Sequence, residues 1–160
     1  MSARSRAQHG SPRLVNRRAN FEYAILEKLE VGIVLLGSEV KSVRNGQVSL
    51  AEGYARVEPA ELGLYLYDVD IAAYAHAGPA GHEPKRRRKL LAHRRQIKHL
   101  LTQLAVRGNT LVPMAMYFVR GRVKLELGIG RGKKSYDKRQ GIKRREHDRE
   151  IRRAMTRKVI

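Results

Sequence analysis

The sequence predicts a mainly β fold with some α structure, a small and mostly antiparallel β-barrel with helices at its periphery. Three observations support this prediction. Apolar segments with strand-like patterns fill the first half of the chain, one helical segment interrupts them, and two strand-like segments joined by a tight turn close the domain. Both ends of the chain are basic and poor in apolar residues, so we expect basic N- and C-terminal tails there.

Local patterns justify the elements of the first half in turn. Residues 1–18 carry five arginines and no acid and show no hydrophobic period, so they are assigned to a mobile basic arm. Dense apolar residues, a helix-capping serine and turn residues between apolar runs then predict strands and one short helix. In order, these are two strands within 21–36 broken near 30–32, a helix over 39–44 capped by Ser38 and ended by Asn45-Gly46, and strands over 49–58 and 64–71.

A loop and a helix open the second half. Glycines and prolines mark residues 72–84 as a loop, and the basic run at 85–89 leads into a helix that Gly108-Asn109 ends. The apolar positions that share one face of this helix are Leu90, Ile97, Leu101 and Leu104.

A β-hairpin closes the predicted domain. Residues 122–130 alternate strictly between apolar and polar, and their partner is the segment at 110–119, joined through Arg120-Gly121. Both faces of residues 111–119 are apolar, which indicates a strand covered on two sides.

Charge divides the chain into three parts. The whole chain has a net charge of +19, far more than solubility requires. Residues 131–160 contain thirteen basic and four acidic groups, a net charge of +9, whereas residues 19–130 carry only +5. We therefore expect an RNA-binding β-barrel domain over 19–130, flanked by the arm at 1–18 and a basic C-terminal tail at 131–160.

The composition argues against several classes of protein. No apolar run of about 18 residues is present and no apolar stretch follows the N-terminal arginines, so neither a membrane span nor a secretory signal is expected. The absence of cysteine excludes thiol catalysis, and the six histidines form no i, i+4 metal pair. The glycines and lysines at 128–135 fit no phosphate-loop register. We expect a cytoplasmic protein that is not an enzyme, with no catalytic residue, no cofactor, no metal and no membrane partner.

Three features allow more than one interpretation. Glu39 is either an acid that interacts favourably with a helix dipole or a carboxylate that accepts hydrogen bonds from RNA. The basic run at 85–89 is a solvated face, a nuclear-targeting patch or a phosphate-binding patch, and the arginines on the following helix favour nucleic acid. The C-terminal tail is either floppy or becomes helical inside a channel walled by RNA.

Several short motifs run from Asn16 to the end of the chain. They are Asn16-Arg17-Arg18-Ala19 with Glu22-Tyr23, Gly37-Ser38-Glu39-Val40-Lys41-Ser42-Val43-Arg44, Arg88-Lys89-Leu90-Leu91, Leu111-Val112-Pro113, and Arg131-Gly132-Lys133-Lys134 with Asp137-Lys138-Arg139. In order and spacing the chain resembles the small protein B family of bacterial transfer-messenger RNA (SsrA RNA) binding proteins. It departs from that family at Asn20-Phe21, where Arg-His is usual, and at Ala92, where many members have leucine.

The resemblance implies a fold, partners and site residues. The fold is an OB-like β-barrel, and the partners are the tRNA-like domain of transfer-messenger RNA and the stalled 70S ribosome. Residues expected on the RNA-facing surface are Asn16, Glu39, Leu91 and His93, to which we add the cationic neighbours Lys41, Arg88 and Lys89. Residues expected to contact phosphates where the tail leaves the barrel are Lys133, Lys134, Lys138 and Arg139.

The resemblance also assigns the tail to the ribosome. Tyr136 is expected to stack on a base in the small-subunit decoding centre, and Ile151 and Met155 to lie on a helix in the empty messenger channel. The tail is thus expected to be disordered alone and helical in the ribosome.

A monomeric adaptor for transfer-messenger RNA is the leading hypothesis. The alternative is a structural RNA-binding protein, such as a ribosomal component or an assembly factor, which would share the charge and the tails. An RNA-processing enzyme would need a metal or a general base that the sequence does not display. The RNA that copurifies with the protein would distinguish the first two hypotheses.

Overall fold

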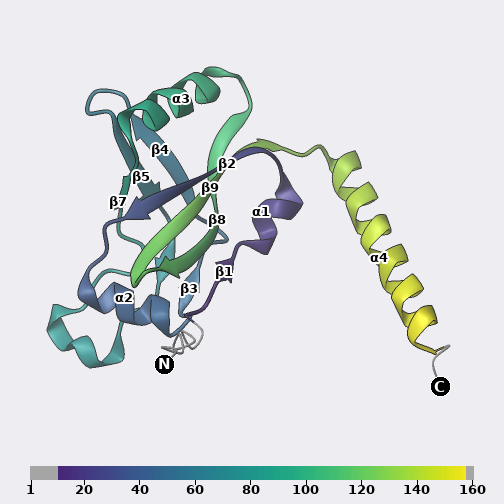
Figure 1. The fold of residues 1–160 in the computed structure, drawn as a ribbon, viewed down its shortest axis with the longest axis horizontal. Helices are drawn as coiled ribbons and strands as arrows, with labels where there is room; N and C mark the ends of the chain where they lie inside the picture. The colour runs from purple at the N-terminus through teal and green to yellow at the C-terminus, as the bar shows by residue number, and fades with distance from the viewer. Residues whose placement is uncertain (1–10, 158–160) are drawn as a thin grey trace, which may run out of the picture.

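The computed structural model describes residues 11–157, and it is mainly β, with an antiparallel sheet and surrounding helices (Figure 1). The elements in chain order are β1 (Leu14–Val15), α1 (Arg17–Glu22), β2 (Tyr23–Ile33), α2 (Gly37–Arg44), β3 (Val48–Ser49), β4 (Tyr54–Glu58), β5 (Gly63–Tyr67), β6 (Asp70–Ile71), the 3-10 helix η1 (Ala75–Ala80), β7 (Arg88–Leu91), α3 (Arg94–Ala105), β8 (Asn109–Val119), β9 (Arg122–Gly132) and α4 (Ser135–Arg157).

Seven strands form the main sheet, in the order β1-β8-β4-β5-β7-β2-β9, and every pairing is antiparallel. Because β8 also pairs with β9, the ladder from β8 through β4, β5, β7, β2 and β9 returns to its starting strand. Two joins are narrow, since β4 meets β8 at one residue pair and β2 meets β7 at two. A separate two-stranded sheet pairs β3 with β6.

The closing hairpin is confirmed by β8 and β9. Val119 pairs with Arg122, and the two turn residues Arg120 and Gly121 have positive φ angles of 50° and 76°. Two consecutive positive φ angles are typical of the type I′ turn, whose twist matches that of the flanking strands. The alternating apolar residues of β9 are buried in the core, as predicted: Val123, Leu125, Leu127 and Ile129.

The main cluster of buried apolar side chains lies on the inner face of the sheet, and a small second cluster lies on its outer face. The main cluster includes Val43 of α2 and Ile97 and Leu100 of α3, so both helices are fastened to the sheet by apolar side chains. The second cluster joins Ala19 of α1 to Val112 and Met114 of β8. β8 is therefore covered on two faces, which explains why both of its alternating sets are apolar.

The N-terminal predictions need correction. Leu14 and Val15 pair with β8 and Arg17 begins α1, so residues 14–18 belong to the folded body and not to a mobile arm. Residues 11–13 of the predicted arm are described and precede β1, and residues 1–10 lie outside the described residues. The break predicted at 30–32 is also wrong, because β2 is a single strand of 11 residues whose irregularity is a bulge between Ile25 and Glu27.

The predicted start of the central helix is wrong as well. Residues Arg88–Leu91 form β7, which pairs with β5 and β2, and the helix α3 begins only at Arg94. Leu90 is buried as a strand residue, not as the first position of a helix face. The strands predicted at 49–58 and 64–71 are each divided, and Asp68 takes a positive φ of 54° at the second division.

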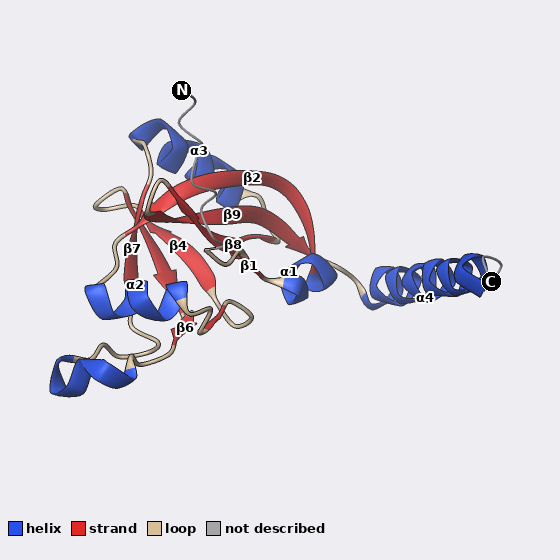
Figure 2. Cartoon of the chain, turned by 60° about the horizontal axis from the view of Figure 1, so that its bottom comes forward, coloured by secondary structure: helices blue, strands red, loops and turns tan. Residues whose placement is uncertain are grey.

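Helix α4 extends away from the sheet body and is surrounded by solvent over most of its length (Figures 1 and 2). Residues 135–157 form a helix in the structure, the conformation expected for the tail in the ribosome, and disorder of the tail on its own stays a prediction. Residues with high helix propensity dominate this segment, so local preference suffices to favour the helix once it is started.

Candidate nucleic-acid interface

The candidate residues fall into three places in the fold. One group surrounds α2, the end of β7 and the start of α3, a second lies where β9 passes into α4, and a third lies along α4. Within the first group, Lys41, Lys89, Leu91 and His93 are exposed, whereas Glu39 and Arg88 are buried. Asn16 lies apart from the three groups, at the start of α1, and is also buried.

Asn16 is a structural residue in this fold, so its expected place on the RNA-facing surface is corrected. Its side-chain oxygen accepts a hydrogen bond from the Ala19 amide (3.1 Å) and caps α1. Its side-chain amide donates to the carbonyl oxygens of Leu50 (3.0 Å) and Pro113 (2.9 Å). The side chain is almost fully buried, so it ties α1 to the sheet and does not face a ligand.

Glu39 is also buried, with no exposed surface, so the expected direct contact with RNA is corrected. Its carboxylate accepts two hydrogen bonds from Arg86, Nε to Oε1 at 2.8 Å and Nη2 to Oε2 at 2.6 Å. Oε1 also accepts from Arg88 Nε (2.8 Å), and Oε2 accepts from the Leu36 amide (2.7 Å). Burial raises the pKa of Glu39, but these donors outweigh it, so the pKa lies below its ordinary value.

The position of Glu39 also corrects the predicted helix cap. The Leu36 amide at the start of α2 donates to Glu39, whereas the Ser38 hydroxyl contacts His82 Nδ1 (2.8 Å). Glu39 therefore combines two roles, because it holds the first turn of α2 and binds two arginines of the segment before and within β7.

Arg88 is the buried partner of Glu39 and cannot contact a ligand directly, which corrects its place among the RNA-binding residues. Its Nη atoms donate to the carbonyl oxygens of Val69 (2.7 Å), Pro84 (2.8 Å) and Arg86 (3.1 Å). Burial lowers the pKa of Arg88, and the hydrogen bond and charge of Glu39 offset this effect in part. The pair fixes the basic segment before β7 against α2.

The exposed residues of this group form a mixed apolar and basic patch. Leu91 is 53% exposed, and Val34 and Leu36 are 46% and 50% exposed in the loop before α2. The Val34 amide donates to the Lys89 carbonyl (2.9 Å), which holds this loop beside β7. Large exposed apolar side chains close together, with cations around them, indicate a surface that a ligand covers.

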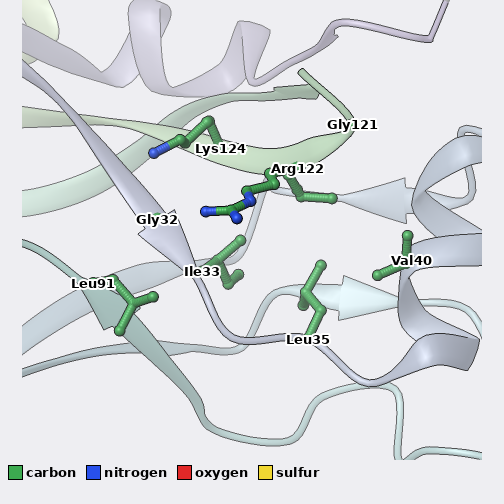
Figure 3. Close-up of a pocket in the computed structure, with 9 residues that line it drawn as sticks. Gly32, Ile33, Leu35, Val40, Leu91, Gly121, Arg122 and Lys124 are labelled. Carbon is green, nitrogen blue, oxygen red and sulfur yellow. The ribbon is translucent and has the colours of Figure 1, made fainter. Parts of the chain in front are cut away.

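A hollow of about 330 Å³ opens at this patch, between α2 and the tip of the β8–β9 hairpin (Figure 3). The residues that line it are Gly32, Ile33, Leu35, Val40, Leu91, Gly121, Arg122, Val123 and Lys124. Neither Arg122 nor Lys124 is among the site residues expected from the sequence. Residues 122–130 alternate between polar and apolar side chains, and Arg122 and Lys124 are two of the polar positions. This pattern places both residues on the side of the strand opposite the core.

The tail leaves the body through a short connection fixed to α1. The Lys133 amide donates to the Glu22 carbonyl (2.8 Å), and Lys133 Nζ donates to the Asn20 carbonyl (3.0 Å). Lys133 is therefore partly occupied in holding the end of α1, whereas Lys134 and Arg139 are exposed and Lys138 is half-buried. On α4 itself Arg145 lies over the ring of Phe21, with 5.7 Å between its guanidinium carbon and the ring centroid.

The three candidate residues of α4 are open to solvent. Tyr136 is 67%, Ile151 40% and Met155 66% exposed, and the Tyr136 hydroxyl accepts a hydrogen bond from Gln140 (2.9 Å). These side chains add apolar surface to a strongly cationic helix, which suits a contact with an anionic partner that also offers stacked or apolar groups.

The described part of the chain contains no cluster of three or more metal-ligating side chains. Over residues 11–157, no helix combines the length and the apolar character that a membrane crossing requires.

Comparisons with known proteins identify relatives of the whole folded region. The family model described as "SmpB protein" matches residues 13–157. The chain is 49% identical to an SsrA-binding protein of Syntrophobacter fumaroxidans over 85% of this chain and 83% of the relative. It is 42% identical to an SsrA-binding protein of Corynebacterium diphtheriae over 99% of this chain and 97% of the relative.

A solved structure agrees with these relatives. One chain from the work described as "tmRNA-SmpB: a journey to the center of the bacterial ribosome" is 46% identical and superposes with a TM-score of 0.66. The match covers 78% of this chain and 86% of the solved one.

Proposed function

The chain belongs to the SmpB family, and on this premise we propose that it binds the tRNA-like domain of transfer-messenger RNA and delivers this RNA to stalled ribosomes. The observation that carries the proposal is the end-to-end likeness to SsrA-binding proteins, at 42% identity over 99% of this chain. A relative with the same fold was solved in work on transfer-messenger RNA and the ribosome.

The body of the protein is the RNA-binding part of this proposal. The cycle of paired strands is an OB-like barrel, a fold whose surface and loops bind nucleic acid in many proteins. The exposed Lys41, Lys89, Leu91 and His93 are the groups that meet the RNA. Asn16, Glu39 and Arg88 support them from beneath, by fixing α1, α2 and the segment before β7.

The tail is the ribosome-binding part. Lys134, Lys138 and Arg139, with Lys133 at the connection, lie where phosphates would meet the exit of the tail from the body. Tyr136 stacks on a base in the decoding centre, and Ile151 and Met155 lie in the empty messenger channel. The protein acts in this role as a cytoplasmic monomer. The role needs no catalytic chemistry, because binding and delivery require contacts only.

Sequencing the RNA that copurifies with the full-length protein tests the proposal. Transfer-messenger RNA should be enriched, and purified protein should prefer its tRNA-like domain to a random single strand of equal length at moderate salt. Enrichment of ribosomal RNA alone would favour a structural component of the ribosome and contradict the proposal. Because phosphate contacts release counterions, the affinity should fall as the salt concentration rises.

A further inference from the structure

The start of α4 lies against α1, which is on the side of the body from which α4 extends (Figures 1 and 2). Of residues 135–156, only Lys138 and Gly141 are half-buried, and Arg145 follows them on the same face of the helix. The guanidinium carbon of Arg145 lies 5.7 Å from the centroid of the Phe21 ring. The contact with α1 therefore follows one stripe of α4 and ends at Arg145, beyond which the helix is open to solvent.

The Phe21 ring is the group of α1 that attracts Arg145. A guanidinium over the face of an aromatic ring is attracted by the negative charge of that face. Glu22 is the one acid of α1, and its carboxylate is already bound by Arg18 (2.9 Å). Arg17 is an exposed cation of the same short helix. Without the ring, two basic helices would meet at this point and their like charges would repel each other.

A phosphate group competes with this ring for Arg145. An exposed cation–π contact is weak, whereas arginine binds phosphate through two parallel charge-assisted hydrogen bonds. Residues 135–157 carry nine basic and four acidic groups, so α4 attracts any polyanion that comes near it. A polyanion that lies along α4 therefore offers Arg145 a stronger partner than Phe21.

We propose that Phe21 and Arg145 form a latch, which holds the first turns of α4 against α1 in the free protein and opens when a polyanion binds Arg145. Lys133 keeps the start of α4 at α1 in both states, through its hydrogen bonds to the Glu22 and Asn20 carbonyls. The closed latch gives α4 one direction, and the open latch lets the helix turn about this connection. Phe21 is thus a positioning residue for the tail, a role that goes beyond the proposed function.

Spin labels on the full-length protein measure the direction of α4. The chain has no cysteine, so Arg56→Cys on β4 and Asp148→Cys on α4, both exposed positions, carry the only two labels. Double electron–electron resonance should give a narrow peak for the closed latch beside a broad distribution for open tails. In this labelled chain, Phe21→Leu should lower the ratio of closed to open about threefold, the effect of one exposed cation–π pair. Arg145→Gln should cause the same loss from the other side of the contact.

Matched controls separate the latch from general effects of charge and packing. Phe21→Trp should keep the closed peak, because tryptophan attracts a cation best among the aromatic residues. Lys143→Gln removes an exposed cation from the opposite side of α4 and should leave the ratio unchanged. The circular-dichroism signal should be equal for Phe21→Leu and the natural chain, since the latch sets the direction of α4 and not its formation. Arg145→Gln changes only an exposed helix residue, so it tests the contact without altering the body.

Opening is tested with an excess of a short RNA strand of random sequence. The RNA should remove the closed peak of the natural chain, and salt high enough to dissociate the RNA should restore the peak. A closed peak that persists with RNA bound overturns the proposal, and so does a natural chain without a closed peak. If Phe21→Leu keeps the peak, apolar packing holds α4 and the latch is wrong. None of these outcomes decides the proposed function, which depends on the preference for the tRNA-like RNA.

Discussion

Glu39 is the residue on which the basic segment before β7 depends. It binds Arg86 through both carboxylate oxygens and Arg88 through one of them, and both Glu39 and Arg88 are fully buried. A buried guanidinium without its carboxylate is an uncompensated charge, which is far less stable than the pair. Glu39 therefore fixes the position of its two arginines, and its own oxygens are occupied by them.

Glu39→Gln is expected to lower the free energy of unfolding by about 3 kcal/mol, because the buried positive charge of Arg88 then has no negatively charged partner. Urea titration measures this loss. Glu52→Gln is the control, since its pair with Arg18 is largely exposed and should change stability by less than about 1 kcal/mol. A Glu39→Gln protein of full stability but reduced RNA affinity would instead assign Glu39 to direct RNA contact.

The same carboxylate should give the protein part of its acid sensitivity. The pKa of Glu39 is lowered in the folded state, so its contribution to stability is fully present above the pKa of an unfolded glutamate. This contribution is lost as the pH falls through the lower pKa of the folded state. Urea titrations between about pH 6 and pH 3 should show a smaller decline for Glu39→Gln than for the natural chain. Equal declines would contradict this assignment.

Asn16→Ala should reduce stability and leave RNA affinity nearly unchanged. The change removes the cap of α1 and leaves the Leu50 and Pro113 carbonyls without their donor, at a cost of about 2 kcal/mol. Thermal unfolding measures the loss, and the exposed Asn20→Ala serves as the control. Weak RNA binding by a fully folded Asn16→Ala protein would show that the amide reaches the RNA.

The sequence motifs identified these positions but not their burial. Glu39 is 47 and 49 residues from its arginines, and Asn16 is 34 and 97 residues from the carbonyls it binds. A polar residue at a helix start looks the same in sequence whether it faces water or a partner from a distant strand. Only the packing of the sheet decides between the two, so the burial of these side chains could not be predicted from the sequence.

At the scale of elements, the predictions were correct where a short stretch of sequence encodes the structure and wrong where distant strands decide it. The β8–β9 hairpin was predictable because its alternation and its Arg120-Gly121 turn are encoded within one short stretch. β7 was missed because its four residues contain adjacent leucines that fit a helix and a strand equally well. Its strand character comes from pairing with β5 and β2, which are distant in sequence.

Gly141 offers a test of α4 as an element. A methyl group at this position would meet no atom within 4 Å, and the residue lies inside the helix, so Gly141→Ala removes only backbone freedom. The helix should gain up to about 1 kcal/mol, and its circular-dichroism signal in the free protein should rise. Gly132→Ala, equally open but in β9, should leave that signal constant. A fall in that signal for Gly141→Ala would contradict a helical backbone at this position.

At the scale of the whole molecule, the fold separates two kinds of contact. The sheet body holds the hollow beside α2 and the basic segment that Glu39 binds, whereas α4 extends from the body and touches it chiefly at α1 (Figure 2). The connection between them is fixed by Lys133, which binds the Glu22 and Asn20 carbonyls. A rigid exit from the body sets the direction in which a long cationic helix is presented to a second partner.

A chain that ends at Lys134 should therefore separate RNA binding from ribosome rescue. The deletion removes ten basic and four acidic residues, so the net charge falls from +19 to +13 while every residue that lines the hollow beside α2 remains. The affinity for the tRNA-like RNA should stay within a few-fold, with a somewhat weaker dependence on salt, and rescue of stalled ribosomes should be lost. A full-length variant with Tyr136, Ile151 and Met155 changed to alanine keeps the charge and should show the same loss of rescue, which assigns it to these exposed side chains. Loss of RNA affinity in the truncated chain would instead place the main RNA contact on α4, because the sheet body is unchanged.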